Sequence, residues 1–93
     1  MKHTMNIHEL AKELERMYGK MKGYAVIIEA RMDKLERTKK RYKTSAEYSD
    51  LCDELSAVEE FFRDYNQWCT VEEMEETLEC MIYHEKCIIA LLA

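Results

Sequence analysis

The sequence contains no proline and only two glycines, Gly19 and Gly23. Because these two residue types interrupt helices most strongly, their scarcity leaves few places where a helix must stop. Glutamate, lysine, leucine, methionine and alanine are plentiful instead, and all of them favour the helix. We therefore predict an all-α protein.

The sequence also lacks a long apolar segment. Its longest apolar run, residues 87–93, is far too short to span a bilayer, and its first ten residues lack the apolar core of a secretory signal. The four cysteines form no CxxC pair, so we expect reduced thiols and not a disulfide framework. We predict a soluble, cytoplasmic protein that makes no contact with membranes.

Apolar residues recur in the first half of the chain at strict seven-residue spacing, at Ile7, Leu14, Met21, Ile28, Leu35 and Tyr42. This heptad pattern predicts one long helix over about 6–42. If the helix breaks near Gly19 or Gly23, the chain would form four helices instead.

Two capping sequences mark further helices. Thr44 with Glu47, or Ser45 as an equally good cap, opens a helix over about 45–67, and Thr70 with Glu73 opens one over about 71–91. Short connections predict a single domain over 1–93, either an antiparallel three-helix bundle or a long helical hairpin with coiled-coil-like heptad seams.

The expected helices differ in length. The first would reach about 55 Å and the others about 32–35 Å each, so part of the first helix would lack a neighbour within the chain. The apolar residues of this overhang predict the interface of a homodimer, with a fold-back into four helices or a frayed N-terminus as the alternatives. The predicted oligomer-interface residues are Ile7, Leu10, Leu14 and Met17.

Positive charge is scarce in the second half of the chain. Residues 1–43 contain 12 Lys and Arg against 6 Asp and Glu, whereas residues 44–93 contain 2 against 13. The carboxylates form rows along the second and third helices, which would bind a basic partner or simply keep the protein in solution. The predicted acidic face consists of Asp53, Glu60, Asp64, Glu72, Glu73, Glu75, Glu76 and Glu79.

Apolar and aromatic side chains accompany the acidic face. A second stripe on the middle helix and one residue of the apolar C-terminal turns either extend the core or anchor a partner. These candidate anchors are Phe61, Tyr65, Trp68 and Leu91.

A basic segment at 31–43 is the alternative binding site. It would contact phosphates, or it would be neutralised internally by the helix dipole and by Glu47, Asp50, Asp53 and Glu54. The net charge of −5 argues against direct binding of nucleic acid. The candidate nucleic-acid-binding residues are Lys34, Arg37, Lys39, Lys40, Arg41 and Lys43.

Two further features of the third helix are chemically notable. Cys80, His84 and Cys87 share one face and form a weak candidate metal site, since zinc accepts this ligand set but needs a fourth ligand. Glu85 lies within the main apolar stripe and needs a partner, for which we expect Lys34, Lys39 or a tyrosine.

No residues are spaced as a paired acid and base, a glycine-rich phosphate loop or an activated nucleophile. We therefore expect no enzyme activity and no cofactor. The sequence favours a small acidic protein that binds and blocks or adapts a basic nucleic-acid-handling protein, in the manner of phage-type (anti-CRISPR-like) viral inhibitors. The alternative is a nucleic-acid-binding regulator that uses the basic segment of a dimeric coiled coil.

Overall fold

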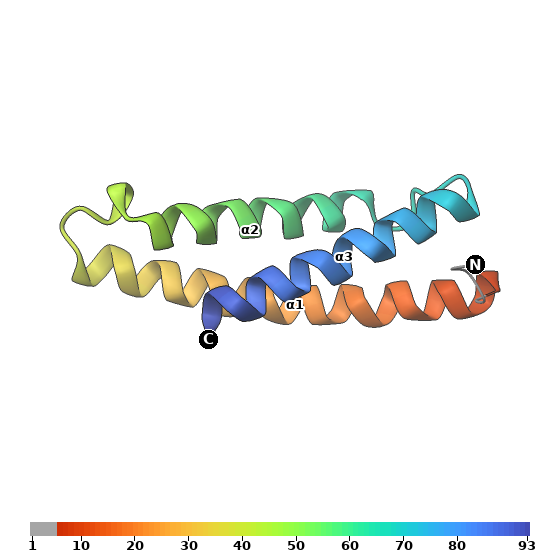
Figure 1. The fold of residues 1–93 in the computed structure, drawn as a ribbon, viewed down its shortest axis with the longest axis horizontal. Coiled ribbons are helices and arrows are strands. Elements are labelled where there is room, and N and C mark those ends of the chain that lie inside the picture. Colours follow the sequence, from red (N-terminus) through yellow and green to blue (C-terminus); the bar gives the residue numbers. More distant parts are fainter. Residues whose placement is uncertain (1–5) are drawn as a thin grey trace.

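The computed structural model describes residues 6–93. Three helices, α1 (Ile7–Thr38), α2 (Ala46–Asp64) and α3 (Val71–Leu92), pack side by side, with a short 3-10 helix η1 (Tyr42–Thr44) between the first two. Figure 1 shows α2 running back along α1 and α3 reversing direction again. The described residues contain no strand, so the prediction of an all-α chain is confirmed.

Each of the three α-helices begins where a side chain caps it. The Oδ1 atom of Asn6 accepts a hydrogen bond from the backbone N–H of Glu9 at 2.9 Å, and Ser45 and Thr70 make the equivalent contacts for α2 and α3. Of the two caps considered for the second helix, the structure therefore uses Ser45. Thr44 instead donates its hydroxyl to the carbonyl of Arg41 at 2.9 Å.

Helix α1 ends at Thr38, four residues before the predicted end at Tyr42. The Thr38 hydroxyl donates a hydrogen bond to the carbonyl of Lys34 at 2.7 Å, a local bond that competes with continued helix. Beyond this point the ring of Tyr42 packs edge-on against Tyr48, with ring centroids 5.0 Å apart. This contact draws the chain off the α1 axis and toward α2.

Helix α1 is continuous through Gly19 and Gly23, so the four-helix alternative is wrong. A Cβ atom added at either glycine would meet nothing within 4 Å. Neither glycine therefore provides a close approach to another helix of this chain.

Helix α2 ends at Asp64, three residues earlier than predicted. Asn66 adopts a left-handed conformation with φ 68°, which asparagine tolerates better than most residues, and the Gln67 side chain donates to the carbonyl of Arg63 at 3.0 Å. Residues 65–70 then lead to the start of α3, which lies toward the N-terminal end of α1 (Figure 1).

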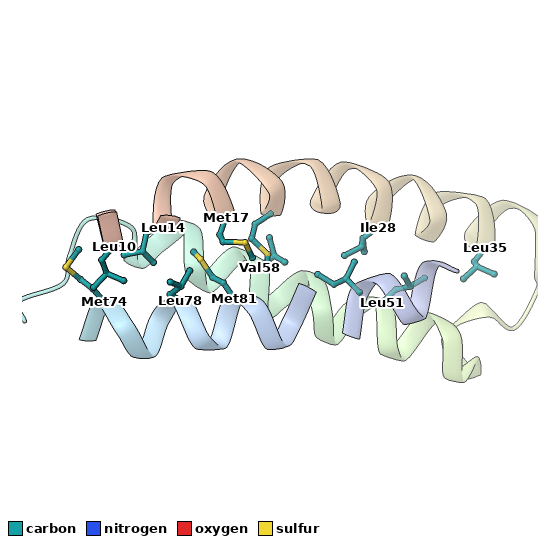
Figure 2. Close-up of a cluster of buried hydrophobic side chains, with 12 residues drawn as sticks. Leu10, Leu14, Met17, Ile28, Leu35, Leu51, Val58, Met74, Leu78 and Met81 are labelled. Carbon is teal, nitrogen blue, oxygen red and sulfur yellow. The ribbon is translucent and has the colours of Figure 1, made fainter. Parts of the chain in front are cut away.

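The N-terminal half of α1 is covered within the chain, and the predicted overhang is wrong. Leu10, Leu14 and Met17 are at most 1% exposed, and Figure 2 shows their side chains near those of Met74, Leu78 and Met81. Because α2 reverses the chain and residues 65–70 extend it, α3 runs parallel to α1 and covers this stripe. Of the predicted oligomer-interface residues, only Ile7 is exposed, at 53%.

One apolar core runs through all three helices. Its buried side chains are Leu10, Leu14, Met17, Met21, Ile28, Leu35, Leu51, Val58, Met74, Leu78, Met81 and Ile88. Two isoleucines of α3, Ile82 and Ile89, lie outside this core and are exposed. Within residues 6–93, no helix has both the length and the apolar character needed to cross a membrane.

Candidate protein-binding groove

Two hollows lie between α2 and α3. The first, of about 390 Å³, lies beside residues 65–70, and the second, of about 400 Å³, lies beside the start of α2 and the end of α3. The first is lined by Glu60, Phe61, Asp64, Gln67, Trp68, Glu73, Glu76, Thr77 and Cys80. The second is lined by Asp50, Asp53, Glu54, Cys87, Ala90 and Leu91. We call the two hollows together the α2–α3 groove.

The α2–α3 groove is strongly acidic. Seven of its lining residues are aspartate or glutamate, and none is lysine or arginine. Arg63 compensates this charge only weakly, because it reaches Glu60 at 4.0 Å and both side chains are more than two-thirds exposed. Among the lining carboxylates, Glu54 has a closer neighbour, the Nδ1 atom of His84 at 2.9 Å. The groove therefore presents a concentrated negative charge to anything that approaches it.

The structure brings together five of the eight carboxylates of the predicted acidic face. Glu60, Asp64, Glu73 and Glu76 line the first hollow, and Asp53 lines the second. The other three residues of α3, Glu72, Glu75 and Glu79, line neither hollow. Glu72 and Glu79 are exposed, and Glu75 is half-buried.

Three of the four predicted anchors also line the groove. Phe61 and Trp68 lie in the first hollow and Leu91 in the second. Tyr65 is the exception, because its ring stacks on Tyr18 of α1 with centroids 4.0 Å apart. Burial at this contact raises the pKa of Tyr65 above its ordinary value.

Trp68 lies in the connection between α2 and α3 and lines the first hollow. Its ring packs edge-on against Tyr65 at 5.3 Å between centroids. Its indole N–H is buried and has no hydrogen-bond acceptor among residues 6–93. An unpaired buried donor of this kind costs about 1–3 kcal/mol, so the indole position is set by ring packing and not by a polar contact.

The weak metal candidate is not supported as a site. Within the described part of the chain, no three His, Cys, Asp or Glu side chains gather closely enough to hold a metal ion. His84 instead places its Nδ1 atom 2.9 Å from Oε1 of Glu54, and its ring meets Phe61 edge-on at 5.8 Å between centroids. Cys80 and Cys87 line separate hollows of the groove.

The predicted basic segment remains exposed. Its six residues, at 34, 37, 39, 40, 41 and 43, form no ion pair with a carboxylate of residues 6–93. The internal neutralisation expected from α2 is confirmed at one residue of the segment, because Glu47 pairs with Arg31 at 3.2 Å, whereas Glu54 contacts His84 instead. The ammonium of Lys43 lies 6.0 Å from the ring centroid of its neighbour Tyr42.

Glu85 lies on the flank of α3 that faces α1, away from the groove, and has two hydrogen-bond partners there. It accepts hydrogen bonds from the Tyr24 hydroxyl at 2.7 Å and from the Lys20 ammonium at 3.1 Å. The expectation of a tyrosine partner is confirmed, and the lysine is Lys20 and neither Lys34 nor Lys39. These bonds, with that of Tyr24 the strongest, lower the pKa of Glu85 and raise the pKa of Tyr24 to about 12.

Sequence reasoning missed five residues of the groove, namely the acids Asp50 and Glu54 and the uncharged residues Gln67, Thr77 and Ala90. The two acids were assigned to the basic end of α1. The helical spacing of Asp50, Asp53, Glu60 and Asp64 was the available signal, because residues three, four and seven apart share a face of a helix.

Comparison with protein-family models, with curated proteins and with solved structures found no match. We therefore infer function from the α2–α3 groove and from its charge.

Proposed function

We propose that this chain is a small, non-catalytic binding protein whose α2–α3 groove binds a basic surface of a nucleic-acid-handling protein. One observation carries this proposal, namely the seven carboxylates that line the groove without any lysine or arginine. Carboxylates along a helix lie about 5–6 Å apart, close to the spacing of phosphates along a nucleic-acid strand. A surface that accepts phosphates would therefore also accept this row of anions.

Charge and apolar contact would have separate roles in this binding. The carboxylates would accelerate encounter with a basic partner, because long-range attraction raises association rates more than it raises affinity. Phe61 and Trp68 would then slow dissociation, since aromatic side chains in a desolvated pocket supply most of the binding energy at many interfaces. An arginine side chain suits such a pocket, because it pairs with carboxylates and stacks on aromatic rings.

The biological role that fits this binding is inhibition or adaptation of the partner. By occupying the nucleic-acid-binding groove of its partner, the protein would exclude the nucleic acid. A phage-type (anti-CRISPR-like) inhibitor would act in this way in the host cytoplasm. We also propose that the protein is a homodimer whose α1 helices pair in a coiled-coil-like manner. Neither role requires a cofactor or a metal.

Competition is the direct test. The probe is a fluorescently labelled helical peptide with arginine at every third or fourth position, titrated with the protein and then displaced with duplex DNA. We expect the double variant Asp64→Asn, Glu76→Gln to weaken peptide binding about tenfold, because each lost attraction is worth roughly 0.7 kcal/mol. Fluorescence anisotropy measures both steps.

The matched control is the double variant Glu72→Gln, Glu79→Gln. It removes the same charge from exposed positions of α3 that line neither hollow. We expect a change of less than twofold. Equal weakening by both double variants would show that net charge, and not the groove, attracts the peptide, and the proposal would fail.

A second candidate function rests on the exposed basic segment at the far end of α1. Its six cations are exposed and form no ion pair within residues 6–93, so phosphates can reach them. A gel-shift titration of duplex DNA at 50 and 200 mM salt tests this alternative. Binding that falls steeply with salt and is lost in Lys39→Gln, Lys40→Gln supports it, and the absence of a shift at the lower salt excludes it.

A further inference from the structure

The face of α1 that points away from the other helices is apolar at its centre. It lies half a turn from the buried stripe, and all of its residues are exposed; Val26 is 66% exposed. Solvent-facing positions of a helix are ordinarily polar, so this composition needs an explanation. We call this row the back face of α1, and it consists of Arg16, Gly19, Gly23, Val26, Ala30 and Asp33.

The back face is complementary to itself when reversed. Its residues are placed symmetrically about the peptide bond between Tyr24 and Ala25. We propose that it binds the back face of a second copy of this chain, with the two α1 helices antiparallel and related by a twofold axis through that point. Such an interface is closed and isologous, because the same residues meet on both copies.

Shape supports the antiparallel pairing. Reversal places Val26 opposite Gly23 of the second copy, and Ala30 opposite Gly19 of the second copy. Each glycine lacks a Cβ atom and has open space where one would be, so it offers a depression for the larger side chain. Small residues at these positions allow two helix backbones to approach closely.

Charge also selects the antiparallel pairing. Reversal sets Arg16 against Asp33 of the second copy, and Lys22, beside the row, near Glu29 of the second copy. A parallel pair would instead set Arg16 against Arg16 and Asp33 against Asp33. Arg16 bonds to Glu13 at 2.7 Å yet remains 53% exposed, so its guanidinium is accessible to a second carboxylate.

The contact leaves the proposed binding site open. No residue of α1 lines either hollow of the α2–α3 groove. A dimer joined through the back face of α1 would therefore present one acidic groove on each copy. This inference specifies the homodimer named under the proposed function, but it does not rest on binding by the groove, since it concerns a different helix face.

The expected affinity is modest. A single helix pair buries less surface than the roughly 1,600 Å² of a standard interface, so we expect a dissociation constant in the micromolar range. Lys12 and Arg37 continue the row by one turn at each end and would oppose each other across the pair, which limits the affinity further.

Sedimentation velocity over a concentration series from about 1 to 500 µM tests the dimer. We expect the wild type to shift from monomer to dimer, and Val26→Lys to weaken dimerisation at least tenfold, because it inserts a charge at the centre of the contact. Tyr83→Lys is the matched control, since Tyr83 is 63% exposed but lies on α3, and it should leave dimerisation unchanged. A wild type that stays monomeric throughout, or a Val26→Lys dimer as tight as the wild type, overturns the proposal.

A charge exchange tests the orientation. Arg16→Asp alone would set two aspartates against each other at each end of an antiparallel pair and should weaken dimerisation several-fold. The double variant Arg16→Asp, Asp33→Arg should restore it, because the opposite charges meet again. In a parallel pair the double variant would still set like charges together, so failure to restore dimerisation overturns the antiparallel arrangement. The circular dichroism of each variant should match the wild type, because all these positions are exposed in the monomer.

Discussion

The carboxylates on the two flanks of α3 have different neighbours. On the flank that faces α1, Glu85 accepts hydrogen bonds from Tyr24 and Lys20. On the flank that faces α2, Glu73 and Glu76 share the groove with further acids from α2 and with no lysine or arginine. The first flank neutralises its carboxylate. The second retains negative charge along the groove, although Glu73 also accepts a hydrogen bond from the backbone N–H of Cys69 at 2.9 Å.

The difference arises from which helix lies opposite. Helix α1 belongs to the basic half of the chain and α2 to the acidic half. Pairing α3 with α1 therefore neutralises charge, and pairing it with α2 concentrates charge. A surface in which like charges are held together at a cost in stability is a common sign of a binding function.

The largest expected effect on stability is in the core, and it tests whether α3 covers the N-terminal half of α1. Leu14→Ala removes a side chain that is fully buried in the core, so we expect it to lower the free energy of unfolding by about 2–5 kcal/mol. Ile7→Ala, in the same predicted stripe but 53% exposed, should change it by less than about 0.5 kcal/mol. Urea denaturation followed by circular dichroism measures both, and equal values would contradict the packing of α3 on α1.

The next effect concerns the neutralised flank of α3. Glu85→Ala removes the acceptor of two hydrogen bonds in a partly exposed site, and we expect it to cost about 1–2 kcal/mol of stability. Glu79→Ala, at an exposed position on the same helix, should cost less than about 0.5 kcal/mol. A cost at Glu79 as large as at Glu85 would show that the contacts with α1 are not the cause.

The same pair predicts how stability depends on pH. The pKa of Glu85 is lowered from 4.5, chiefly by the bond from Tyr24, so its contribution is present above pH 4.5 and is lost as the pH falls further. The pKa of Tyr24 is raised from 10.0 to about 12, chiefly by the bond to Glu85, so its contribution is complete below pH 10 and is lost as the pH rises toward 12.

Glu85→Ala should therefore flatten both limbs of a plot of unfolding free energy against pH. The alkaline limb should be reduced and not abolished, because Tyr48 bonds to Glu36 and its pKa is also raised to about 12. Urea denaturation at intervals from pH 3 to pH 11 provides the plot. An unchanged acid limb in the variant would contradict the role of Glu85.

The smallest effect on stability is expected in the acidic groove. Glu76→Gln removes one of several like charges, so the free energy of unfolding should stay constant or rise by up to about 0.5 kcal/mol at low salt. Raising the salt concentration to 0.5 M should reduce the difference, because salt screens exposed charges. A clear loss of stability in the variant would show that the groove carboxylates support the fold, in contrast to the binding role proposed for them.

Some helix boundaries and side-chain contacts could be predicted from the sequence, and others could not. The start of α3 follows from the capping pattern of Thr70 with Glu73, and the structure confirms it. The partner of Glu85 was predicted as a tyrosine, but the choice of Tyr24 and Lys20 required knowledge of which turn of α1 lies beside α3. The early end of α1 at Thr38 depends on a side-chain hydrogen bond and on the contact of Tyr42 with Tyr48. The helical periodicity of apolar residues does not reveal either contact.

The predicted acidic face shows the same limit. Helical spacing placed eight carboxylates on solvent-facing strips, yet only five of them line the groove, because the groove depends on the angle between α2 and α3. Asp50 and Glu54 join it from positions that the sequence had assigned to the basic segment. Spacing along a helix identifies residues that share a face, but it does not identify the helix that lies opposite.

The sequence by itself determined that this chain is helical, where its capped helices begin and how its charge is divided. These properties are local, since they depend on residues within one or two turns of each other. Only the tertiary structure decided that α3 covers Leu10, Leu14 and Met17, and that the carboxylates of α2 and α3 meet. Both outcomes follow from residues 65–70, which carry the chain to the N-terminal end of α1 before α3 begins, and the path of such a connection depends on the packing of the whole chain.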